Sequence, residues 1–359
     1  MSTRTYLITK LSMFVVVLAL LFPVASVAAQ ESPAGHDMSH MQSGEDHGFM
    51  DRGMDHMVAK GVTLHADLDA ANHVVTLREG PLTLPAHTSH MMMPQPADQI
   101  WVIPFDGWLL AYHPSLVTAE GQSVPGRVLH HTAFWNVDRS DFLCTNKEEH
   151  IFGAGSEMTD WGEVPGFGYH VQKGDRIRVE TMVYNPTDTS YDKVYLQVKI
   201  PYQDSSAAQI RSVYPAWIDV QSCGNSSYDL PAGESAKSGT VVVNFNGMLL
   251  GVGGHLHDFG RQLVLKDSTK NEKVATLDAR VDDKGQLLSI PVVTFAATGG
   301  FRLNEGDRLA VTATYDNLSG KLLRSGAMGI VVGYFVPDDD GRMASLRRPR
   351  KIAAKGASN

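Results

Sequence analysis

Two histidines separated by one residue, His255 and His257, are the sharpest chemical signal in the sequence. On a β-strand, residues i and i+2 project to the same face, so the two imidazoles can present themselves to one metal ion. Because a His-x-His pair alone is a weak motif, two surface histidines on a strand remain the alternative interpretation. Glycines around the pair favour close backbone approach or a bulge; these are Gly251, Gly253, Gly254 and Gly260.

Two further features could take part in the same chemistry. His130 and His131 are adjacent, and neighbours on a regular strand face opposite ways, so joint ligation requires a strand end or a bulge. Met328 precedes an aliphatic strand, where ordinary core packing is the alternative. A thioether is a soft ligand, so Met328 could join the histidines at a metal site.

A stretch near the N-terminus is rich in histidine and methionine. Between positions 36 and 57, nine of 22 residues are of these two types: His36, Met38, His40, Met41, His47, Met50, Met54, His56 and Met57. Mixed thioether and imidazole ligands suit a metal that changes oxidation state, which predicts additional Cu(I) binding without fixed structure. A solvated linker of biased composition is the alternative. A smaller cluster of the same kind occupies residues 87–93.

Residues 1–29 have the pattern of a secretory signal: Arg4 and Lys10, an apolar run, then small residues. The apolar run is about ten residues, shorter than the roughly 20 that a spanning helix needs. We therefore expect a periplasmic or secreted protein with no stable membrane insertion after cleavage. An oxidising compartment makes Cys144 and Cys223 candidates for a disulfide, with two separate buried thiols as the alternative.

Composition narrows the class of protein. With 43% hydrophobic and 19% charged residues, the chain as a whole can build a core. A net charge of −8 argues against a nucleic-acid partner, because such binding relies on Lys and Arg. Two cysteines exclude a disulfide-dense scaffold and a four-cysteine zinc site.

Short apolar alternations bounded by Gly, Pro, Asn and Asp recur from residue 97 onward, with no long helical period between them. This pattern predicts an all-β protein of two tandem jelly-roll β-sandwich domains. The expected organisation is a signal peptide (1–29), a largely disordered Met/His-rich segment (30–96), an N-terminal sandwich (97–203), a C-terminal sandwich (212–337) and a basic disordered tail (338–359).

The order of these motifs resembles the copper type II, ascorbate-dependent monooxygenases, the family of peptidylglycine α-hydroxylating monooxygenase and dopamine β-hydroxylase. The similarity runs from about residue 101 to residue 335 and includes RVLHHTAFWN, CGNSSYDLPAGE and GGHLHDFGRQLVL. It implies two jelly rolls, each holding one copper, that face each other across a solvent-filled cleft. The copper that activates O2 has ligands matched by His255, His257 and Met328. The copper that receives electrons has three histidines, two of them matched by His130 and His131.

The third histidine of that family has no match in this chain. Its position falls at Val183, in the stretch ETMVYN. Met182 is adjacent, but on a regular strand it faces the opposite way and could substitute only with a register shift. His170 and His113 are alternatives without support from spacing. If the missing ligand limits electron transfer, Val183→His is expected to raise turnover.

Two functions follow from different classes. The first is an exported copper monooxygenase that hydroxylates a C–H bond of a small-molecule or peptide substrate, using O2 and a one-electron donor such as ascorbate. The second is a non-catalytic envelope protein that captures, stores or delivers copper, exchanging it with copper donor or acceptor proteins. The His255, His257 and Met328 set favours the enzyme, whereas the N-terminal tract favours the carrier.

Overall fold

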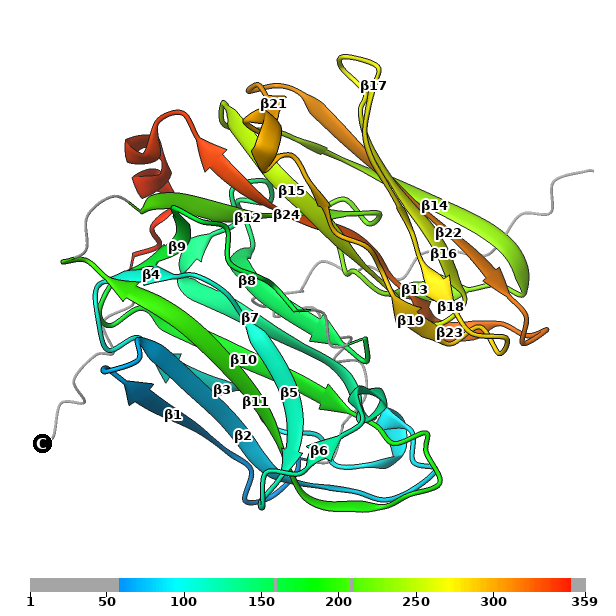
Figure 1. The fold of residues 1–359 in the computed structure, drawn as a ribbon. Helices are drawn as coiled ribbons and strands as arrows, with labels where there is room; N and C mark the ends of the chain where they lie inside the picture. The colour runs from blue at the N-terminus through cyan, green and yellow to red at the C-terminus, as the bar shows by residue number, and fades with distance from the viewer. Residues whose placement is uncertain (1–57, 158–159, 207–209, 350–359) are drawn as a thin grey trace, which may run out of the picture. The chain divides into compact units, whose positions relative to one another are not determined.

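The computed structural model describes residues 58–157, 160–206 and 210–349 (Figure 1). The expected signal peptide and the copper-binding residues from His36 to Met57 lie outside these ranges. Within them the predicted all-β class is confirmed. The helical elements among the described residues are the 3-10 helices η1 (His90–Met92), η2 (Gly126–Val128), η3 (Ala296–Thr298) and η4 (Asp340–Leu346). No helix in this part of the chain is long and apolar enough to cross a membrane.

We call the described residues from 58 to 206 the first half and those from 210 to 349 the second half. The described part of the first half contains eleven strands: β1 (Thr63–Asp69), β2 (Val74–Leu84), β3 (Gln99–Val102), β4 (Gly107–Leu109), β5 (His113–Thr118), β6 (Ser123–Val124), β7 (Leu129–Ser140), β8 (Glu148–Gly155), β9 (Phe167–Val171), β10 (Arg176–Val183) and β11 (Tyr191–Asp204).

The second half contains the remaining strands: β12 (Arg211–Asp219), β13 (Tyr228–Leu230), β14 (Gly233–Val242), β15 (Gly247–Leu256), β16 (Gly260–Asp267), β17 (Glu272–Asp278), β18 (Arg280–Val281), β19 (Leu287–Ser289), β20 (Val293–Thr294), β21 (Phe301–Leu303), β22 (Arg308–Asn317), β23 (Leu323–Ala327) and β24 (Gly329–Pro337). The burial of β22 alternates with period two, as expected for a strand with one face on a core.

The strands pair into three main sheets. The largest has 12 strands and follows the order β1-β2-β11-β4-β9-β12-β24-β15-β20 along its main path. Two four-stranded sheets have the orders β3-β10-β7-β8 and β14-β22-β16-β17. Because β9 of the first half pairs in parallel with β12 of the second, the largest sheet continues from one half into the other.

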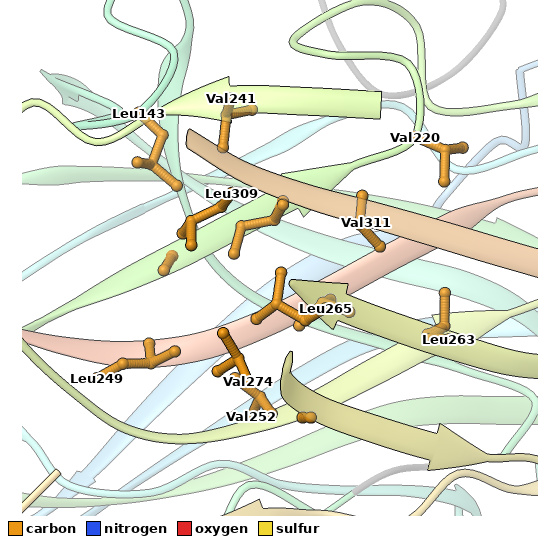
Figure 2. Packing of buried hydrophobic residues seen from close by; sticks show 14 of the residues in the cluster. Leu143, Val220, Val241, Leu249, Val252, Leu263, Leu265, Val274, Leu309 and Val311 are labelled. Carbon is orange, nitrogen blue, oxygen red and sulfur yellow. The ribbon is translucent and has the colours of Figure 1, made fainter. Parts of the chain in front are cut away.

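Each half has its own large hydrophobic cluster. The first-half cluster draws its members from residues 75–202, and the second-half cluster consists mainly of residues 214–346. Phe142, Leu143 and Cys144, from the loop between β7 and β8, join the second-half cluster, of which Figure 2 shows Leu143 together with Val241. The predicted disulfide is confirmed: Cys144 bonds Cys223 with the Cα atoms 5.6 Å apart. The bridge therefore ties a first-half loop to the second half.

Two expectations about the ends of the folded region are wrong. Residues 63–84, expected within a disordered segment, form β1 and β2, because alternate residues of β2 such as Val75 and Leu77 are buried in the first-half cluster. Residues 338–349, expected to belong to a disordered basic tail, are ordered and include η4. Met343 and Leu346 of η4 are buried in the second-half cluster, and Arg347 pairs with Asp175 at 2.5 Å.

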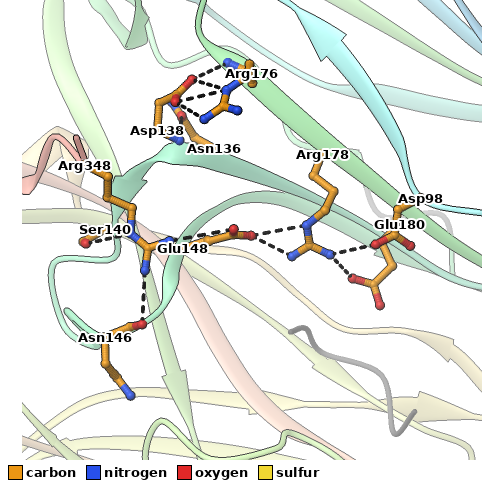
Figure 3. Close-up of polar contacts among 10 residues, drawn as sticks. All are labelled: Asp98, Asn136, Asp138, Ser140, Asn146, Glu148, Arg176, Arg178, Glu180 and Arg348. Atoms are coloured by element: carbon orange, nitrogen blue, oxygen red, sulfur yellow. Dashed lines mark hydrogen bonds and ion pairs between the residues drawn. The ribbon is translucent and has the colours of Figure 1, made fainter. Parts of the chain in front are cut away.

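Charged side chains fix the four-stranded sheet of the first half. Arg178 of β10 bonds Glu148 of β8 at 2.8 Å and Glu180 at 2.7 Å, and it also reaches Asp98 (Figure 3). Arg348 donates to the backbone oxygen of Asn146 at 3.2 Å. Arg178 thus joins β10 to β8, and Arg348 joins the segment after η4 to the loop before β8. These contacts stabilise the sheet that carries the first histidine pair.

Candidate metal centre

The second-half pair sits where β15 ends. His255 is the penultimate residue of the strand and His257 follows its last residue. The two rings lie 5.4 Å apart between centroids, as two-residue spacing on one face allows. Their Nε2 atoms are buried, and neither has a hydrogen-bond partner within the part of the chain that the structure describes. A buried imidazole nitrogen with a free lone pair suits a metal ion.

Glu157 orients His255 and is a residue that the sequence did not single out. Its carboxylate, 4% exposed, lies 3.2 Å from His255 Nδ1. Burial acts to raise the pKa of Glu157, but the His255 imidazole and the hydrogen bonds from His255 and the Gly155 amide lower it below its usual value. A carboxylate that accepts the Nδ1 proton leaves Nε2 for a metal. Because 98 residues separate the partners, no local pattern could reveal the contact.

Tyr315 links His257 to Met328. Its hydroxyl accepts from the His257 backbone N–H at 2.9 Å and donates to the Met328 carbonyl at 2.5 Å. Removing this buried hydroxyl would therefore free both backbone segments.

Met328 directly precedes β24. Alternate residues of this strand, Ile330, Val332 and Tyr334, line cavities that the first-half residue His150 also lines, so this face of β24 is turned toward the first half. Two-residue steps place Met328 on the same face. Met328 is 2% exposed, yet among the described residues it belongs to no hydrophobic cluster. Ligation through its sulfur stays a prediction.

The first-half pair sits at the start of β7, directly after η2. His130 and His131 have rings 4.7 Å apart, and their Nδ1 atoms are 3.2 Å apart, within hydrogen-bond distance. Strand β10 pairs Met182 with His131, and its register shifts between Met182 and Val183. A strand end and an irregularity are thus both present, as joint use of adjacent histidines requires.

The two pairs meet. The His130 ring lies 5.4 Å from the His257 ring, and an ion pair joins the flanking residues, with Arg127 donating two 3.2 Å hydrogen bonds to Asp258. The resemblance implied a solvent-filled cleft between the pairs. In the structure the halves contact each other at this point, and the His130 and His257 rings meet edge to face. They form a single histidine cluster.

Burial disfavours the charged form of three histidines of the cluster, His130, His131 and His257. It lowers the pKa of His130 to about 3, with a further contribution from His90. Burial likewise holds the pKa values of His131 and His257 well below their usual range. Neutral imidazole is the form that binds metal, so these three side chains are in the protonation state that a copper ligand needs at neutral pH.

The residues considered as a third first-half ligand differ in whether they lie near His130 and His131. Val183 is 1% exposed and packs in the first-half core, so a histidine there would enter the core and Val183→His is not expected to restore a ligand. His170 stacks near Trp108, and His113 pairs with Asp160. None of these side chains joins the cluster. His90 of η1 does, with its ring 4.8 Å from the ring of His130.

A cavity of about 400 Å³ opens beside the cluster. His131, His255 and Glu157 line one part of it, and an aromatic wall contains Trp217 and Tyr334. The walls are mostly apolar, with backbone and valine side chains between the rings.

Two glycines of β8 create the room beside the cluster. A Cβ at Gly155 would lie 2.9 Å from His255 Cε1, and one at Gly153 would lie 3.2 Å from Trp217. The Gly-Ala-Gly run of β8 therefore lets an imidazole and an indole approach the same strand.

Across the described residues, no three His, Cys, Asp or Glu side chains already stand in coordination geometry around one point. The chain matches no protein-family model and no curated protein.

Proposed function

We propose that this protein is an exported copper monooxygenase of the type it resembles, with two jelly-roll domains that each contribute ligands to the histidine cluster. His255, His257 and Met328 would hold one copper, and His130 and His131 would contribute to a second. The buried Nε2 atoms of His255 and His257, which have no hydrogen-bond partner among the described residues, support this fit, and burial holds the pKa of His257 well below its usual range. The disulfide is consistent with an oxidising compartment.

Bound copper supplies the one-electron chemistry by which O2 inserts an oxygen atom into a C–H bond, with ascorbate or a similar donor as the reductant. The chain supplies the positioning. Glu157 holds the Nδ1 proton of His255, which turns Nε2 away from the carboxylate. Tyr315 fixes the backbone of His257 relative to that of Met328. These contacts keep the second-half ligands in place while the substrate binds.

The cavity carries the proposal. A copper store has no need of an apolar chamber against its ligands, whereas an oxygenase must hold a C–H bond there. About 400 Å³ lies within the roughly 300–1,000 Å³ of small-molecule sites. The aromatic wall suits a substrate with an apolar or ring-bearing end, including a small molecule or a peptide terminus.

A substitution that fills the cavity tests the proposal. Gly253 lines the cavity, and a Cβ there would meet only Val292 Cγ2 at 3.5 Å, so the backbone has room for Gly253→Leu, whose side chain adds bulk to the cavity. We expect unchanged copper content and ascorbate-dependent hydroxylation reduced at least about tenfold, measured with a panel of aromatic and peptide substrates. If the copper-loaded native chain hydroxylates none of them, the proposal is wrong.

A copper carrier is the second candidate. Next to His90, Met91 is 42% exposed and Met92 is 70% exposed, and such thioethers can exchange Cu(I) with a donor or acceptor protein. Rapid Cu(I) transfer to a soluble chelator, without substrate-dependent O2 uptake, would favour this function.

A further inference from the structure

The turn that contains His90 is fixed to the end of β10 by one buried side chain. Gln95, 7% exposed, donates from Nε2 to the carbonyls of His90 and Val183, both at 3.0 Å. Its Oε1 accepts from the Val183 backbone N–H at 2.8 Å. A bridge between Thr88 and Asn185 adds two backbone hydrogen bonds of 2.9 and 2.7 Å. The position of the turn is therefore set by β10.

This attachment brings the His90 imidazole to the end of β10, where the strand itself has Val183 and no histidine. The Val183 side chain packs in the core, while its backbone holds the turn whose His90 ring stands edge-on to His130 at 4.8 Å and 74°. His90 precedes β3 in the chain, whereas the family pattern places the third histidine at Val183, at the end of β10.

We propose that His90 is a copper ligand that completes a three-imidazole set with His130 and His131. Two imidazoles hold Cu(I) in near-linear fashion, whereas Cu(II) prefers more ligands in a tetragonal arrangement, so a third nitrogen makes both oxidation states accessible. The inference rests on the copper site of the proposed function and not on its oxygenase activity.

Met182 is the competing third ligand. It is the cross-strand partner of His131, and directly paired residues project to the same face of a sheet. Its side chain is 7% exposed, whereas the His90 turn reaches the surface through Met91 and Met92. His90 lets copper enter from solvent, and a fully buried thioether does not.

The test uses the full chain with the nine His and Met residues between positions 36 and 57 replaced by Ser, which we call the tract-silent chain. In this background we compare His90→Gln with two controls. His87→Gln changes an exposed histidine of the same segment that pairs with Asp188, and Met182→Leu removes the competing sulfur. Copper is counted after equilibration with a Cu(I) chelator, and bound nitrogens are counted by pulsed electron paramagnetic resonance of the Cu(II) form.

We expect His90→Gln to weaken one of the two coppers at least about 100-fold, beyond the roughly 10–100-fold effect of losing a ligand's hydrogen-bond partner. That copper loses one nitrogen coupling, and both controls behave like the background. Near-ultraviolet circular dichroism checks folding, with His90→Asn as a second variant at the same position.

Two outcomes overturn the inference. In the first, His90→Gln retains both coppers with unchanged nitrogen couplings; in the second, Met182→Leu loses one copper. In either case the proposed function survives if the tract-silent chain binds copper and hydroxylates substrate. A tract-silent chain that binds no copper overturns both.

Discussion

The two histidine pairs are held in different ways. His255 and His257 are anchored by other groups: a carboxylate bonds one ring, and the Tyr315 hydroxyl bonds the backbone of the other. His130 and His131 instead contact each other through their Nδ1 atoms, 3.2 Å apart. The second-half pair is thus oriented before metal binds.

The acids behind the pairs differ as well. Glu157 contacts His255 and has a lowered pKa. Glu79, behind the first-half pair, accepts a 2.6 Å hydrogen bond from Thr181, which bonds Thr132 next to His131. Burial raises the pKa of Glu79 to about 7. One pair is therefore contacted by a charged acceptor, whereas the carboxyl nearest the other pair in this hydrogen-bond chain is easily neutral.

The largest expected effect comes from removing the soft ligand of the anchored pair. Met328→Ile keeps volume and polarity similar, so the chain should fold with a loss below about 1.5 kcal/mol. Substrate hydroxylation should fall to background, and Cu(I) affinity should drop, measured by chelator competition. Met343→Ile, at a methionine equally buried but in the second-half core, is the matched control and should retain both. Equal behaviour of the two variants would make Met328 an ordinary core residue.

The Glu79 carboxyl predicts a pH dependence of folding. Its folded-state pKa of about 7 lies above the ordinary 4.5, so between these values the folded chain binds more protons than the unfolded chain. This contribution is fully present below about pH 4.5 and is lost as pH rises to about 7, a change on the order of 3 kcal/mol.

Denaturant titrations at several pH values measure this change. Glu79→Gln should show a flatter dependence than the native chain over this range, since the amide does not titrate. Identical slopes for the two chains would show that Glu79 ionises normally and that the two pairs have similar acids behind them.

A smaller effect should follow from loosening the anchored pair. Glu157→Gln removes the charged acceptor of the His255 Nδ1 proton and should weaken the second-half copper roughly 10–100-fold, with the first-half copper unchanged. Glu163→Gln, at an exposed residue of the same cavity rim, is the control. If Glu157→Gln weakens the binding of both coppers, Glu157 does not act on the second-half pair alone.

Sequence patterns predict what depends on neighbouring residues. Two-residue periodicity indicated the strands and the shared face of His255 and His257, and an even cysteine count indicated the disulfide. The same periodicity was present in residues 74–84, but the composition of the preceding tract obscured it. Glu157 and His90 could not be predicted, because they reach the cluster through a contact between the halves and through the Gln95 hydrogen bonds.

The central claim is that the histidine pairs of the two halves form one cluster that holds two neighbouring copper ions. Electron paramagnetic resonance of the tract-silent chain loaded with Cu(II) tests it most directly. The rings of His130 and His257 are 5.4 Å apart, so we expect two ions held by the two pairs to lie close enough to interact magnetically. The account predicts two coppers per chain with dipolar broadening and a half-field transition, which disappear in His257→Gln. Two coppers with the sharp spectra of isolated ions, or no bound copper, would contradict it.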